Sequence, residues 1–539
     1  MDSVRNSQFL WDGFDPSSEQ LDIAVLKETK AKSIVTKSFY FTGRELGNGK
    51  KSRIFAQICY KSTCKDKPAV LLVSNYSHTI DEQALTDIAS RGFVAMSIDF
   101  AGRRDVGLHT LYPDALDYCN ADVARTIFEI DKTPRETKLF EYAFNCRRAI
   151  TYLQDVENVS SVSVLTEGKG VYVGIIVLGV DKRVKNGAIL FGNLQRSYPG
   201  PTAEEMEDLE LNVAYDYRNQ VWTLGLAPQT YALQIKVPVY VVNSANSPYV
   251  DITEASKVFL RVNKSSRFLI LPNTMDYLPE SYVDGVIRWL KGEKAPVKSE
   301  IKSYFDGGDY CLKVITTHPL EKTSLWYCTD NDDRAKHWTK AELTESSNGY
   351  VAKLNLYVKE CSLAAFALFD GDIPVSTTLF TERVTAQNVK KAANIIFSGA
   401  GKQMLIPLST DRQWWNVKLQ QKLTKGYLNI LGAQGKALAT FAINDKSIRI
   451  DPLFTVCFDV CSKLRQQVRV TAVCNFGSDN ECYSQSCEII GNGRWERLNF
   501  DRVNFHSVLD GKQLPQTKKV DMLVISAENE IIVNNFFLV

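Results

Sequence analysis

The sequence predicts an α/β protein in which a doubly wound, mostly parallel sheet is followed by two all-β domains. Three observations predict this fold class. Short apolar strands alternate with helical segments from residue 33 to residue 294, as in a sheet covered on both faces. From residue 295 to 385, and again from residue 392 to 539, strands and turns follow one another without helices. The 539 residues, 45% of them hydrophobic, are enough for several cores.

The first predicted domain, residues 33–294, contains strands of two kinds. Ser38–Phe41 and Arg53–Tyr60 alternate apolar and polar residues, as half-buried strands do. Ala69–Val73 and Val94–Ile98 are continuous apolar runs, as in strands buried on both faces. The other strands expected here are Val162–Leu165, Ala188–Phe191, Val237–Val242 and Phe268–Leu271, and the helices are Glu141–Gln154, Gly170–Gly179 and Tyr282–Leu290. We expect residues 1–32 to pack on this domain as an N-terminal segment and residues 194–236 to form an insertion.

The second part predicts two β-domains. Residues 295–385 fit a small Ig-like sandwich, and residues 392–539 are long enough for a jelly roll of about eight strands. The sandwich strands are expected at Lys313–Thr316, Ser324–Cys328, Val351–Tyr357 and Ala364–Phe369. The jelly-roll strands are expected at Lys402–Pro407, Gly426–Leu431, Val468–Cys474, Glu496–Val503, Val520–Ser526 and Ile531–Leu538.

Composition and charge argue against several classes of function. A formal net charge of +2 gives no strong field that would attract nucleic acid or an anionic membrane. No basic and apolar leader and no apolar run of spanning length is seen, so we expect a cytoplasmic protein with no membrane partner. The cysteines and the five histidines lack the spacing of a zinc site, and the glycines around Gly168 miss the phosphate-loop and dinucleotide spacings. We therefore expect neither a metal nor a cofactor.

Several motifs, taken in order, resemble one enzyme family. They are Trp11–Pro16, Phe41–Arg44, Pro134–Glu136, Arg147–Ala149, Gly179–Lys185, Val237–Val239 and the stretch Ser324–Phe369. Together they resemble acetyl-xylan-esterase-like and dienelactone-hydrolase-like α/β-hydrolases that carry C-terminal β-domains. The resemblance covers most of residues 8–380. It implies a serine nucleophile on the turn after the fifth strand, an acid after the seventh strand and a histidine base after the eighth.

The turn that should carry the nucleophile is present, but its central residue is a glycine. The strand Ser161–Leu165 runs into Thr166-Glu167-Gly168-Lys169-Gly170, and Gly168 stands at the nucleophile position of the family pattern. Glycine tolerates the strained dihedral angles of such a turn without steric cost. The sequence thus predicts a turn of the family's shape without its hydroxyl.

The other three parts of the family's machinery are also altered. Ser74-Asn75-Tyr76-Ser77 stands in place of the glycine-rich oxyanion loop, whose bare backbone donates N–H groups. Ser247 stands at the position of the acid, and Asp276 or Met275 lies nearest to that of the base. These losses led to the interpretation of a non-catalytic pseudoenzyme. Such a protein would act as a binding or structural component of a larger protein assembly, a cytoskeletal one among the options.

Two alternatives stay open at this stage. One is an active serine-hydrolase-type esterase or peptidase that uses displaced residues. Under the non-catalytic interpretation, the lost triad would leave a vestigial pocket lined by Glu167, Lys169, Ser247, Asp276 and Tyr76. This pocket would either hold a ligand or be filled by Tyr76 and Met275.

The other alternative is a glycan-binding protein. The stretch Gly493–Phe500 and the residues after it resemble jelly-roll modules of the carbohydrate-binding type. Trp414, Trp415 and Tyr427 are the candidates for stacking on sugar rings, and burial in the core of the domain is the competing explanation for them.

Overall fold

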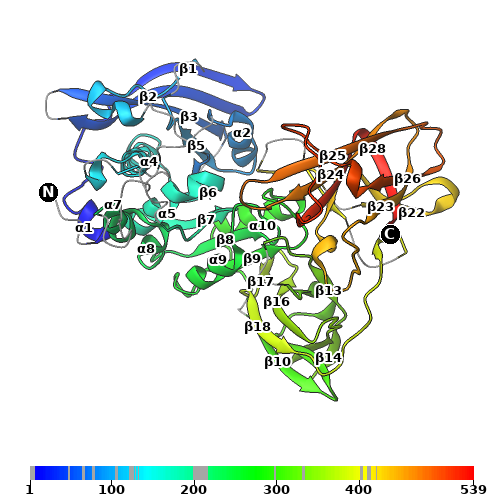
Figure 1. The fold of residues 1–539 in the computed structure, drawn as a ribbon. Helices are drawn as coiled ribbons and strands as arrows, with labels where there is room; N and C mark the ends of the chain where they lie inside the picture. Colours follow the sequence, from blue (N-terminus) through cyan, green and yellow to red (C-terminus); the bar gives the residue numbers. More distant parts are fainter. Residues whose placement is uncertain are drawn as a thin grey trace. The chain divides into compact units, whose positions relative to one another are not determined.

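The structure is a computed structural model and forms two compact units (Figure 1). It describes residues 6–46, 49–63, 67–75, 79–102, 107–119, 127, 129–130, 133–197, 217–296, 299–330, 334–400, 405–409, 414–419 and 422–539. The first unit comprises Met1–Val242, Thr253–Phe268 and Asp284–Lys294, and the second comprises Asn243–Ile252, Leu269–Val283 and Ala295–Val539. The division into four domains stays a prediction.

The first unit is built on a mixed sheet with the strand order β1-β2-β3-β5-β4-β6-β7-β8. The strands from β5 to β8 pair in parallel, whereas β3 is antiparallel to both of its neighbours and β1 is antiparallel to β2. The expectation of a mostly parallel sheet is confirmed in this part. The strands are β1 (Ala24–Ala31), β2 (Ile34–Leu46), β3 (Lys50–Lys61), β4 (Pro68–Val73), β5 (Val94–Ile98), β6 (Ser161–Glu167), β7 (Val184–Leu190) and β8 (Val239–Ser244).

One strand of this sheet was not predicted. All eight residues of β1 are exposed, so the segment carries no alternation of apolar and polar residues from which a strand could be recognised. The apolar runs in β4 and β5 are buried almost throughout, as expected of strands covered on both faces.

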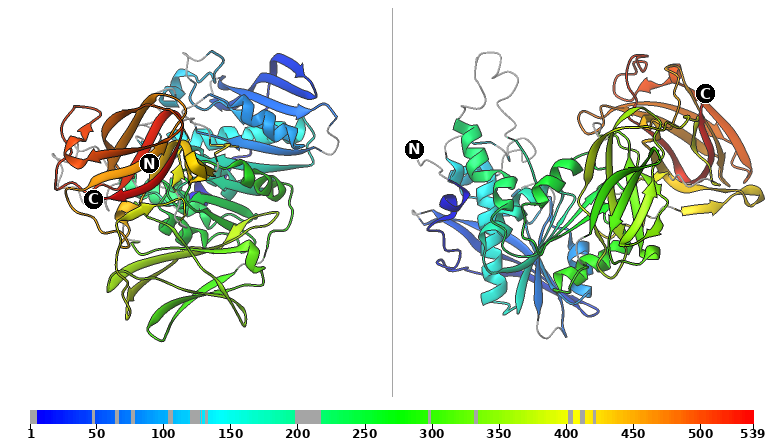
Figure 2. Two further views of the ribbon diagram at one scale, coloured as in Figure 1. Left: turned by 90° about the vertical axis from the view of Figure 1, so that its right-hand side faces the viewer. Right: turned by 90° about the horizontal axis from the view of Figure 1, so that it is seen from below.

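Helices cover both faces of this sheet (Figure 2). The helix α5 is apolar on all sides and is buried from Val171 to Leu178, so it packs as a core helix. No helix in the described ranges is long and apolar enough to cross a membrane. The longer helices are α2 (Glu82–Ser90), α4 (Lys138–Asp155), α5 (Val171–Val180), α9 (Ile252–Phe259) and α10 (Glu280–Leu290), and the shorter ones are α1 (Ser7–Trp11), η2 (Asp114–Cys119), η3 (Pro134–Glu136), η4 (Gly168–Gly170), α7 (Tyr217–Val221), η6 (Trp222–Leu226) and α8 (Pro228–Ala232).

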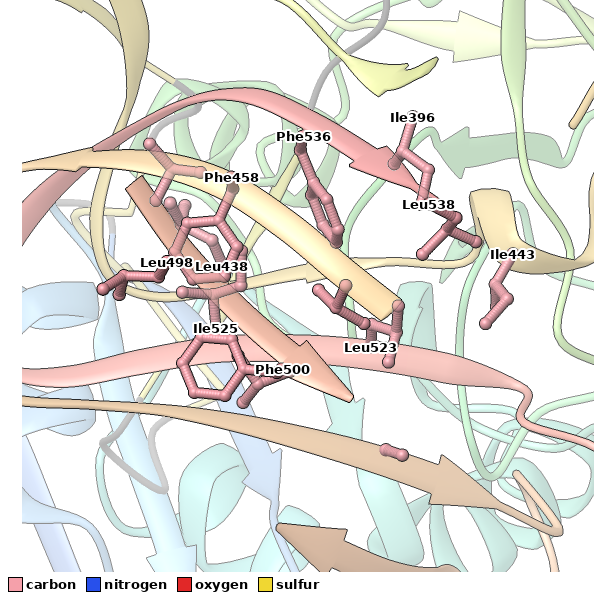
Figure 3. Close-up of a cluster of buried hydrophobic side chains, with 14 of the residues drawn as sticks. Ile396, Leu438, Ile443, Phe458, Leu498, Phe500, Leu523, Ile525, Phe536 and Leu538 are labelled. Atoms are coloured by element: carbon pink, nitrogen blue, oxygen red, sulfur yellow. The ribbon is translucent and has the colours of Figure 1, made fainter. Parts of the chain in front are cut away.

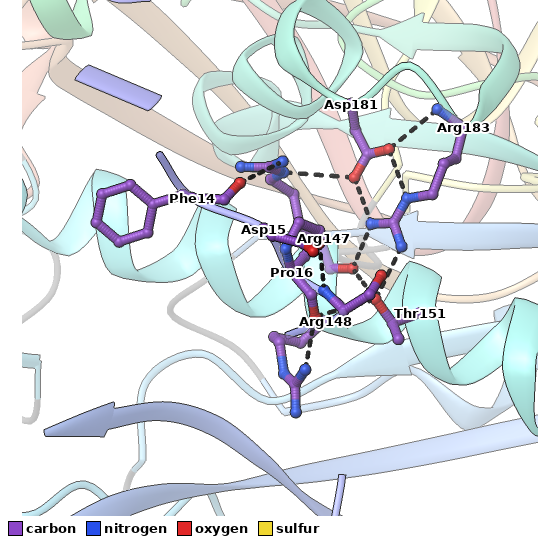
Figure 4. Close-up of polar contacts among 9 residues, drawn as sticks. Phe14, Asp15, Pro16, Arg147, Arg148, Thr151, Asp181 and Arg183 are labelled. Atoms are coloured by element: carbon purple, nitrogen blue, oxygen red, sulfur yellow. Dashed lines mark hydrogen bonds and ion pairs between the residues drawn. The ribbon is translucent and has the colours of Figure 1, made fainter. Parts of the chain in front are cut away.

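A polar network on α4 holds the N-terminal segment, and it explains several of the motifs shared with the hydrolase family (Figure 4). The buried Arg148 donates to the carbonyl oxygens of Pro16, Glu19, Gln20 and Thr42. One side chain thus satisfies four backbone acceptors, because a guanidinium carries five N–H donors in a fixed planar arrangement.

The neighbouring arginine extends this network to the next helix. Arg147 lies 3.4 Å from Asp181 and also donates to the carbonyl oxygen of Phe14, while Asp181 accepts from Arg183. Trp11 stacks on Phe140 with the ring centroids 4.4 Å apart. The motifs containing these residues therefore have a structural role in the first unit.

The second unit is all-β apart from short turns. We define the middle β region as β10–β18. Four of its strands form a sheet with the order β10-β11-β15-β14. The strands β17, β16, β12 and β13 are neighbours, in that order, in another sheet. The strands are β9 (Arg267–Leu271), which enters this unit at Leu269, β10 (Glu300–Asp306), β11 (Asp309–Ile315), β12 (Thr323–Cys328), β13 (Thr339–Ala341), β14 (Thr344–Ser346), β15 (Gly349–Lys353), β16 (Glu360–Phe369), β17 (Val375–Ser376) and β18 (Phe380–Thr385). The expected all-β character is confirmed, and the Ig-like assignment stays a prediction.

The C-terminal β region, which we define as β19–β28, forms a ten-stranded sheet system around one hydrophobic core (Figure 3). Phe458 lies at its centre and packs against Phe500 and Phe536, with ring centroids 5.7 and 5.8 Å away. The strands are β19 (Ile395–Phe397), β20 (Ile406–Pro407), β21 (Lys422–Lys425), β22 (Leu431–Thr440), β23 (Thr455–Cys461), β24 (Gln466–Cys474), β25 (Glu481–Ile489), β26 (Trp495–Asp501), β27 (His506–Ser507) and β28 (Met522–Leu538). The jelly-roll assignment stays a prediction.

Two expectations for this region are wrong. The segment Gly426–Leu431 is mainly a turn, because Leu428 and Asn429 have φ angles of 58° and 60°, which a strand cannot contain. The expected strands Val520–Ser526 and Ile531–Leu538 are one strand, β28, which continues through an irregularity in its pairing with β22.

Candidate functional site

The turn after β6 has the strained geometry that the sequence predicts. Gly168 has a φ of +54°, in the left-handed region that favours glycine. A Cβ atom on Gly170 would lie 2.3 Å from the carbonyl oxygens of both Val73 and Ser74. The turn therefore packs directly against the end of β4, and only a residue without a side chain fits there.

This packing places Ser74 beside Glu167. In the parallel pair of β4 and β6, Val73 is the partner of Thr166, so the next residue on each strand stands at the same carboxyl edge of the sheet. Ser74 and Glu167 are those residues. Ligands of open α/β sheets bind at this edge, so the pair occupies the part of the fold where a site is expected.

The carboxyl group of Glu167 is buried and easily protonated. Burial raises its pKa to about 7, the nearby Asp81 carboxylate adds to the rise, and the Ser74 hydroxyl opposes it. The residue is 5% exposed, and its Oε2 atom has no hydrogen-bond partner among the described residues. A carboxyl group with a pKa near neutrality can both take up and release a proton at physiological pH.

The Ser74 hydroxyl is also buried and unbonded. Its Oγ atom is inaccessible to solvent and makes no hydrogen bond within the part of the chain that the structure describes. The hydroxyl does contact the Glu167 carboxyl group, whose pKa it lowers as a hydrogen-bond donor, but the contact falls short of full hydrogen-bond geometry. Both lone pairs of the hydroxyl are free, as a nucleophile requires.

The remaining predicted residues of the first unit are placed as follows. Asn75 is half-buried next to Ser74, and Lys169 is exposed on the turn. Tyr76 and Ser77 lie outside the described residues, so the predicted oxyanion loop is described only at Ser74 and Asn75. Gly168 offers no hydroxyl, so any nucleophile of this unit must come from another residue or from water.

The second unit brings Ser247 and Asp276 together. The Ser247 hydroxyl donates to Asp276 Oδ2 at 2.7 Å, and it accepts the N–H groups of Tyr249 and Val250 at 3.1 and 2.8 Å. Burial raises the pKa of Asp276 to about 7, and the hydrogen bond from Ser247 opposes this rise. The hydroxyl of Ser247 is thus fully used inside its own loop.

Met275 fills space rather than lining an open pocket. It packs against a buried cluster of the second unit that includes Ala335, Phe441 and Met522. The predicted pocket residues therefore separate into two sets, because Glu167 and Lys169 belong to the first unit and Met275 to the second.

The aromatic residues proposed for sugar binding differ in exposure. Trp415 is buried, with 7% of its surface exposed, which agrees with the competing explanation of a core residue. The carbonyl oxygen of Trp414 accepts the N–H of Leu278 at 2.8 Å. Tyr427 is 41% exposed, and the Arg494 guanidinium lies 5.8 Å from its ring centroid. Tyr427 is the one of the three with an exposed ring.

Across the described ranges, no three His, Cys, Asp or Glu side chains lie close enough together to hold a metal ion.

Two features of the structure are not predicted from the sequence. One is the pairing of Ser74 with Glu167, which are 93 residues apart in the sequence and meet only through the register of β4 and β6. The other is a cavity in the C-terminal β region, which no local sequence pattern indicates.

The first unit agrees with the α/β-hydrolase type that the sequence predicts. The agreement lies in the strand order, in the antiparallel β3 and in the strained turn between β6 and α5. No protein-family model and no curated protein sequence matches this chain.

Solved structures of the same fold type are similar to the chain. An acetyl xylan esterase from Paenibacillus sp. aligns with a TM-score of 0.41 and 14% identity over 54% of this chain and 96% of its own. Acetyl xylan esterase 1 from Thermoanaerobacterium sp. aligns with a TM-score of 0.36 and 14% identity over 51% and 88%. A dienelactone hydrolase-like promiscuous phosphotriesterase from metagenomic libraries aligns with a TM-score of 0.30 and 14% identity over 45% and 83%.

These comparisons correct the interpretation of the chain as a non-catalytic protein. The similar structures are esterases and hydrolases, and a glucuronoyl esterase from Solibacter usitatus is a further one. The interpretation as a non-enzymatic part of an assembly is therefore wrong. It rested on Gly168, Ser247, Asp276 and the altered loop Ser74–Ser77, and these departures from the family pattern still leave other hydroxyl and carboxyl groups in the chain.

Proposed function

We propose that this chain hydrolyses carboxylic esters, with Ser74 as the nucleophile and Glu167 as the general base. The observation that carries this proposal is the buried Ser74 hydroxyl, which contacts the Glu167 carboxyl group at the carboxyl ends of β4 and β6. Neither Ser74 Oγ nor Glu167 Oε2 is held in a full hydrogen bond by any described group. Leaving two buried polar atoms unsatisfied costs about 1–3 kcal/mol each, and a catalytic role is a reason to retain them.

The reaction needs only groups that the chain supplies and water. The Glu167 carboxylate takes the proton of Ser74 while Oγ attacks the ester carbonyl carbon. The tetrahedral intermediate then collapses, and the departing alkoxide takes the proton from Glu167. A water molecule, deprotonated by Glu167, then attacks the acyl-serine carbonyl carbon. The bond to Oγ breaks, the acid is released, and Glu167 returns the proton to Oγ, which restores Ser74.

The ionisation behaviour of Glu167 supports the role of a base. A carboxylate of ordinary pKa is too weak a base to deprotonate a hydroxyl efficiently, and burial strengthens the base by disfavouring its charged form. The start of α5 lies directly after this turn, and the positive end of the helix dipole there favours a developing oxyanion.

The competing serine is less suited to attack. The Ser247 hydroxyl donates one hydrogen bond and accepts two, so its proton and both lone pairs are engaged. Its attack on a carbonyl would require these bonds to break first. We therefore assign Ser247 and Asp276 to the stability of their loops.

The test is hydrolysis of short acyl esters together with labelling by a fluorophosphonate that modifies reactive serines. We expect the native chain to be labelled and to turn over the ester. Ser74→Ala should lose both signals, and Glu167→Gln should lower kcat/KM by about a hundredfold or more. Ser163→Ala is the matched control, because Ser163 is a buried serine of β6, the strand that carries Glu167, and its hydroxyl is bonded to the Leu290 carbonyl oxygen.

Circular dichroism and thermal unfolding of each variant would show that the fold is kept. Turnover that survives in folded Ser74→Ala and disappears in Glu167→Gln would overturn the assignment of the nucleophile. Absence of labelling and of turnover in the native chain would overturn the proposed function.

A further inference from the structure

The C-terminal β region contains a cavity that the hydrolase site does not use. Its volume is about 430 Å³, within the range of small-molecule sites. The lining includes Asn444, Asp445, Lys446, Phe454, Arg502 and Lys519. We propose that this cavity binds an uncharged, polyhydroxylated molecule of about monosaccharide size.

A buried arginine builds one wall of the cavity. Arg502 is 5% exposed and donates to the carbonyl oxygens of Pro515, Gln516 and Lys518, which fixes the loop before β28. Its guanidinium lies 5.3 Å from the ring centroid of Phe454. The wall is therefore preorganised, which lowers the entropy cost of binding a ligand.

The charges around the cavity balance one another. Lys446 pairs with Asp330 at 3.2 Å, and Lys519 lies 3.6 Å from Asp521. Lys518 forms an ion pair with Glu481, so each lining lysine has a carboxylate partner. Arg502 has only backbone carbonyl oxygens as acceptors among the described residues, and the lining residue Asp445 supplies one charge of the opposite sign. The four positive charges around the cavity are thus matched by four negative ones, which leaves no excess positive charge for an anion. This balance favours a neutral ligand.

The polar groups suit hydroxyl ligands in particular. Asp445 accepts the N–H of Ser447 at 2.7 Å with one carboxylate oxygen, and its other oxygen lies 3.8 Å from the Nε2 atom of His337. Burial lowers the pKa of His337, so the imidazole is neutral and does not neutralise Asp445. A carboxylate with free lone pairs accepts hydrogen bonds from alcohols, while Lys446 and Lys519 can donate to them.

Apolar side chains complete the lining. Ile443, Ile448, Ile450, Phe454 and Val520 contribute hydrocarbon surface beside the polar groups. A sugar ring presents C–H groups on its faces and hydroxyl groups at its rim, so a cavity of this mixed character matches it on both counts. An all-polar anion or a purely apolar molecule would leave half of the lining unmatched.

The site is different from the aromatic one considered from the sequence. None of Trp414, Trp415 and Tyr427 lines the cavity, so substitution can separate the two. Tyr427→Ala tests the aromatic candidate, and Ile450→Trp tests the cavity by filling it.

The experiment is calorimetric titration of the full-length chain with neutral monosaccharides and inositols, and with gluconate and inorganic phosphate as charged comparators. We expect saturable binding of at least one neutral compound. Asp445→Ala and Ile450→Trp should each weaken that binding at least tenfold. Lys436→Ala, an exposed lysine of the same region outside the cavity, should leave it within twofold.

Three results would overturn the inference. They are the absence of saturable binding to every neutral compound, tighter binding of the charged comparators, and binding that persists in folded Ile450→Trp. A loss caused by Tyr427→Ala but not by Ile450→Trp would move the site to the exposed aromatic ring. Ester turnover by the same samples reports the hydrolase site separately.

Discussion

Two serine–carboxyl pairs in this molecule look alike in composition and differ in their hydrogen bonds. Ser74 and Glu167 belong to the first unit, and Ser247 and Asp276 belong to the second. In both pairs burial raises the pKa of the carboxyl group to about 7. In the second pair the hydroxyl is engaged in three hydrogen bonds. In the first, among the described residues, its contact with the Glu167 carboxyl group falls short of full hydrogen-bond geometry.

This difference separates a structural pair from a reactive one. A hydroxyl whose lone pairs hold backbone N–H groups stabilises its loop, and the same engagement blocks attack on a carbonyl carbon. A hydroxyl that makes no hydrogen bond contributes little to stability and remains free to react. The two pairs have similar residue types and similar carboxyl pKa values. They differ in whether the lone pairs of the serine hydroxyl oxygen accept hydrogen bonds.

The first way to break the comparison is to push Ser74 away from Glu167. Gly170→Ala would place a Cβ atom 2.3 Å from the backbone carbonyl oxygens of Val73 and Ser74, which cannot yield as a side chain could. We expect the free energy of unfolding to fall by about 3 kcal/mol, measured by urea denaturation. Ester turnover at a temperature where the variant is folded should fall as well.

A matched control for this substitution is Gly371→Ala. Gly371 is exposed, and a Cβ atom there would meet nothing within 4 Å. Its free energy of unfolding should change by less than about 0.5 kcal/mol. If Gly170→Ala were equally harmless, the close packing of the turn against β4 would be wrong.

The second test uses pH, because the raised pKa values give opposite signs for stability and for activity. Asp276 holds its proton in the folded state up to about pH 7 and loses it near its ordinary pKa when unfolded. Its stabilising contribution is full below about pH 4 and is lost as the pH rises through 7. Between pH 5 and pH 8 the free energy of unfolding of the native chain should therefore fall. In Asp276→Asn this fall should be smaller by about 2 kcal/mol.

Activity should change in the opposite direction with pH. Glu167 must be ionised to act as a base, so kcat/KM should rise with an apparent pKa of about 7. Asp276→Asn should leave this profile unchanged while it flattens the stability curve. A shift of the activity profile in Asp276→Asn would show that the two pairs are not independent.

The sequence predicts the frame of the candidate site well. The apolar run of β4, the strand β6 and the glycine turn are local features, and the left-handed Gly168 follows from the need for a residue without Cβ. The all-β character of the second unit follows equally from local spacing. The exposed strand β1 and the turn at Leu428 do not, because neither has the expected periodicity.

The pairing within the site could not be predicted from local patterns. Ser74 was assigned to an oxyanion loop and Glu167 to a pocket wall, and nothing in either segment refers to the other. Their proximity depends on the register of two parallel strands and on the absence of a side chain at Gly170. The cavity beside Arg502 depends likewise on strands and loops brought together by the whole region.

The smallest expected effect sharpens the comparison most directly, because it measures the two hydroxyls in the same way. Ser247→Ala removes the acceptor of the Tyr249 and Val250 N–H groups and the donor to Asp276, so unfolding should become easier by about 1–2 kcal/mol. Ser74→Ala removes a hydroxyl without hydrogen bonds among the described residues, so stability should stay within about 0.5 kcal/mol of the native value. Ester turnover should show the reverse order, with Ser247→Ala within twofold of native and Ser74→Ala inactive.

Equal losses of stability in the two variants would mean that the Ser74 hydroxyl makes stabilising hydrogen bonds, as the Ser247 hydroxyl does. The reason for assigning the nucleophilic role to Ser74 would then disappear.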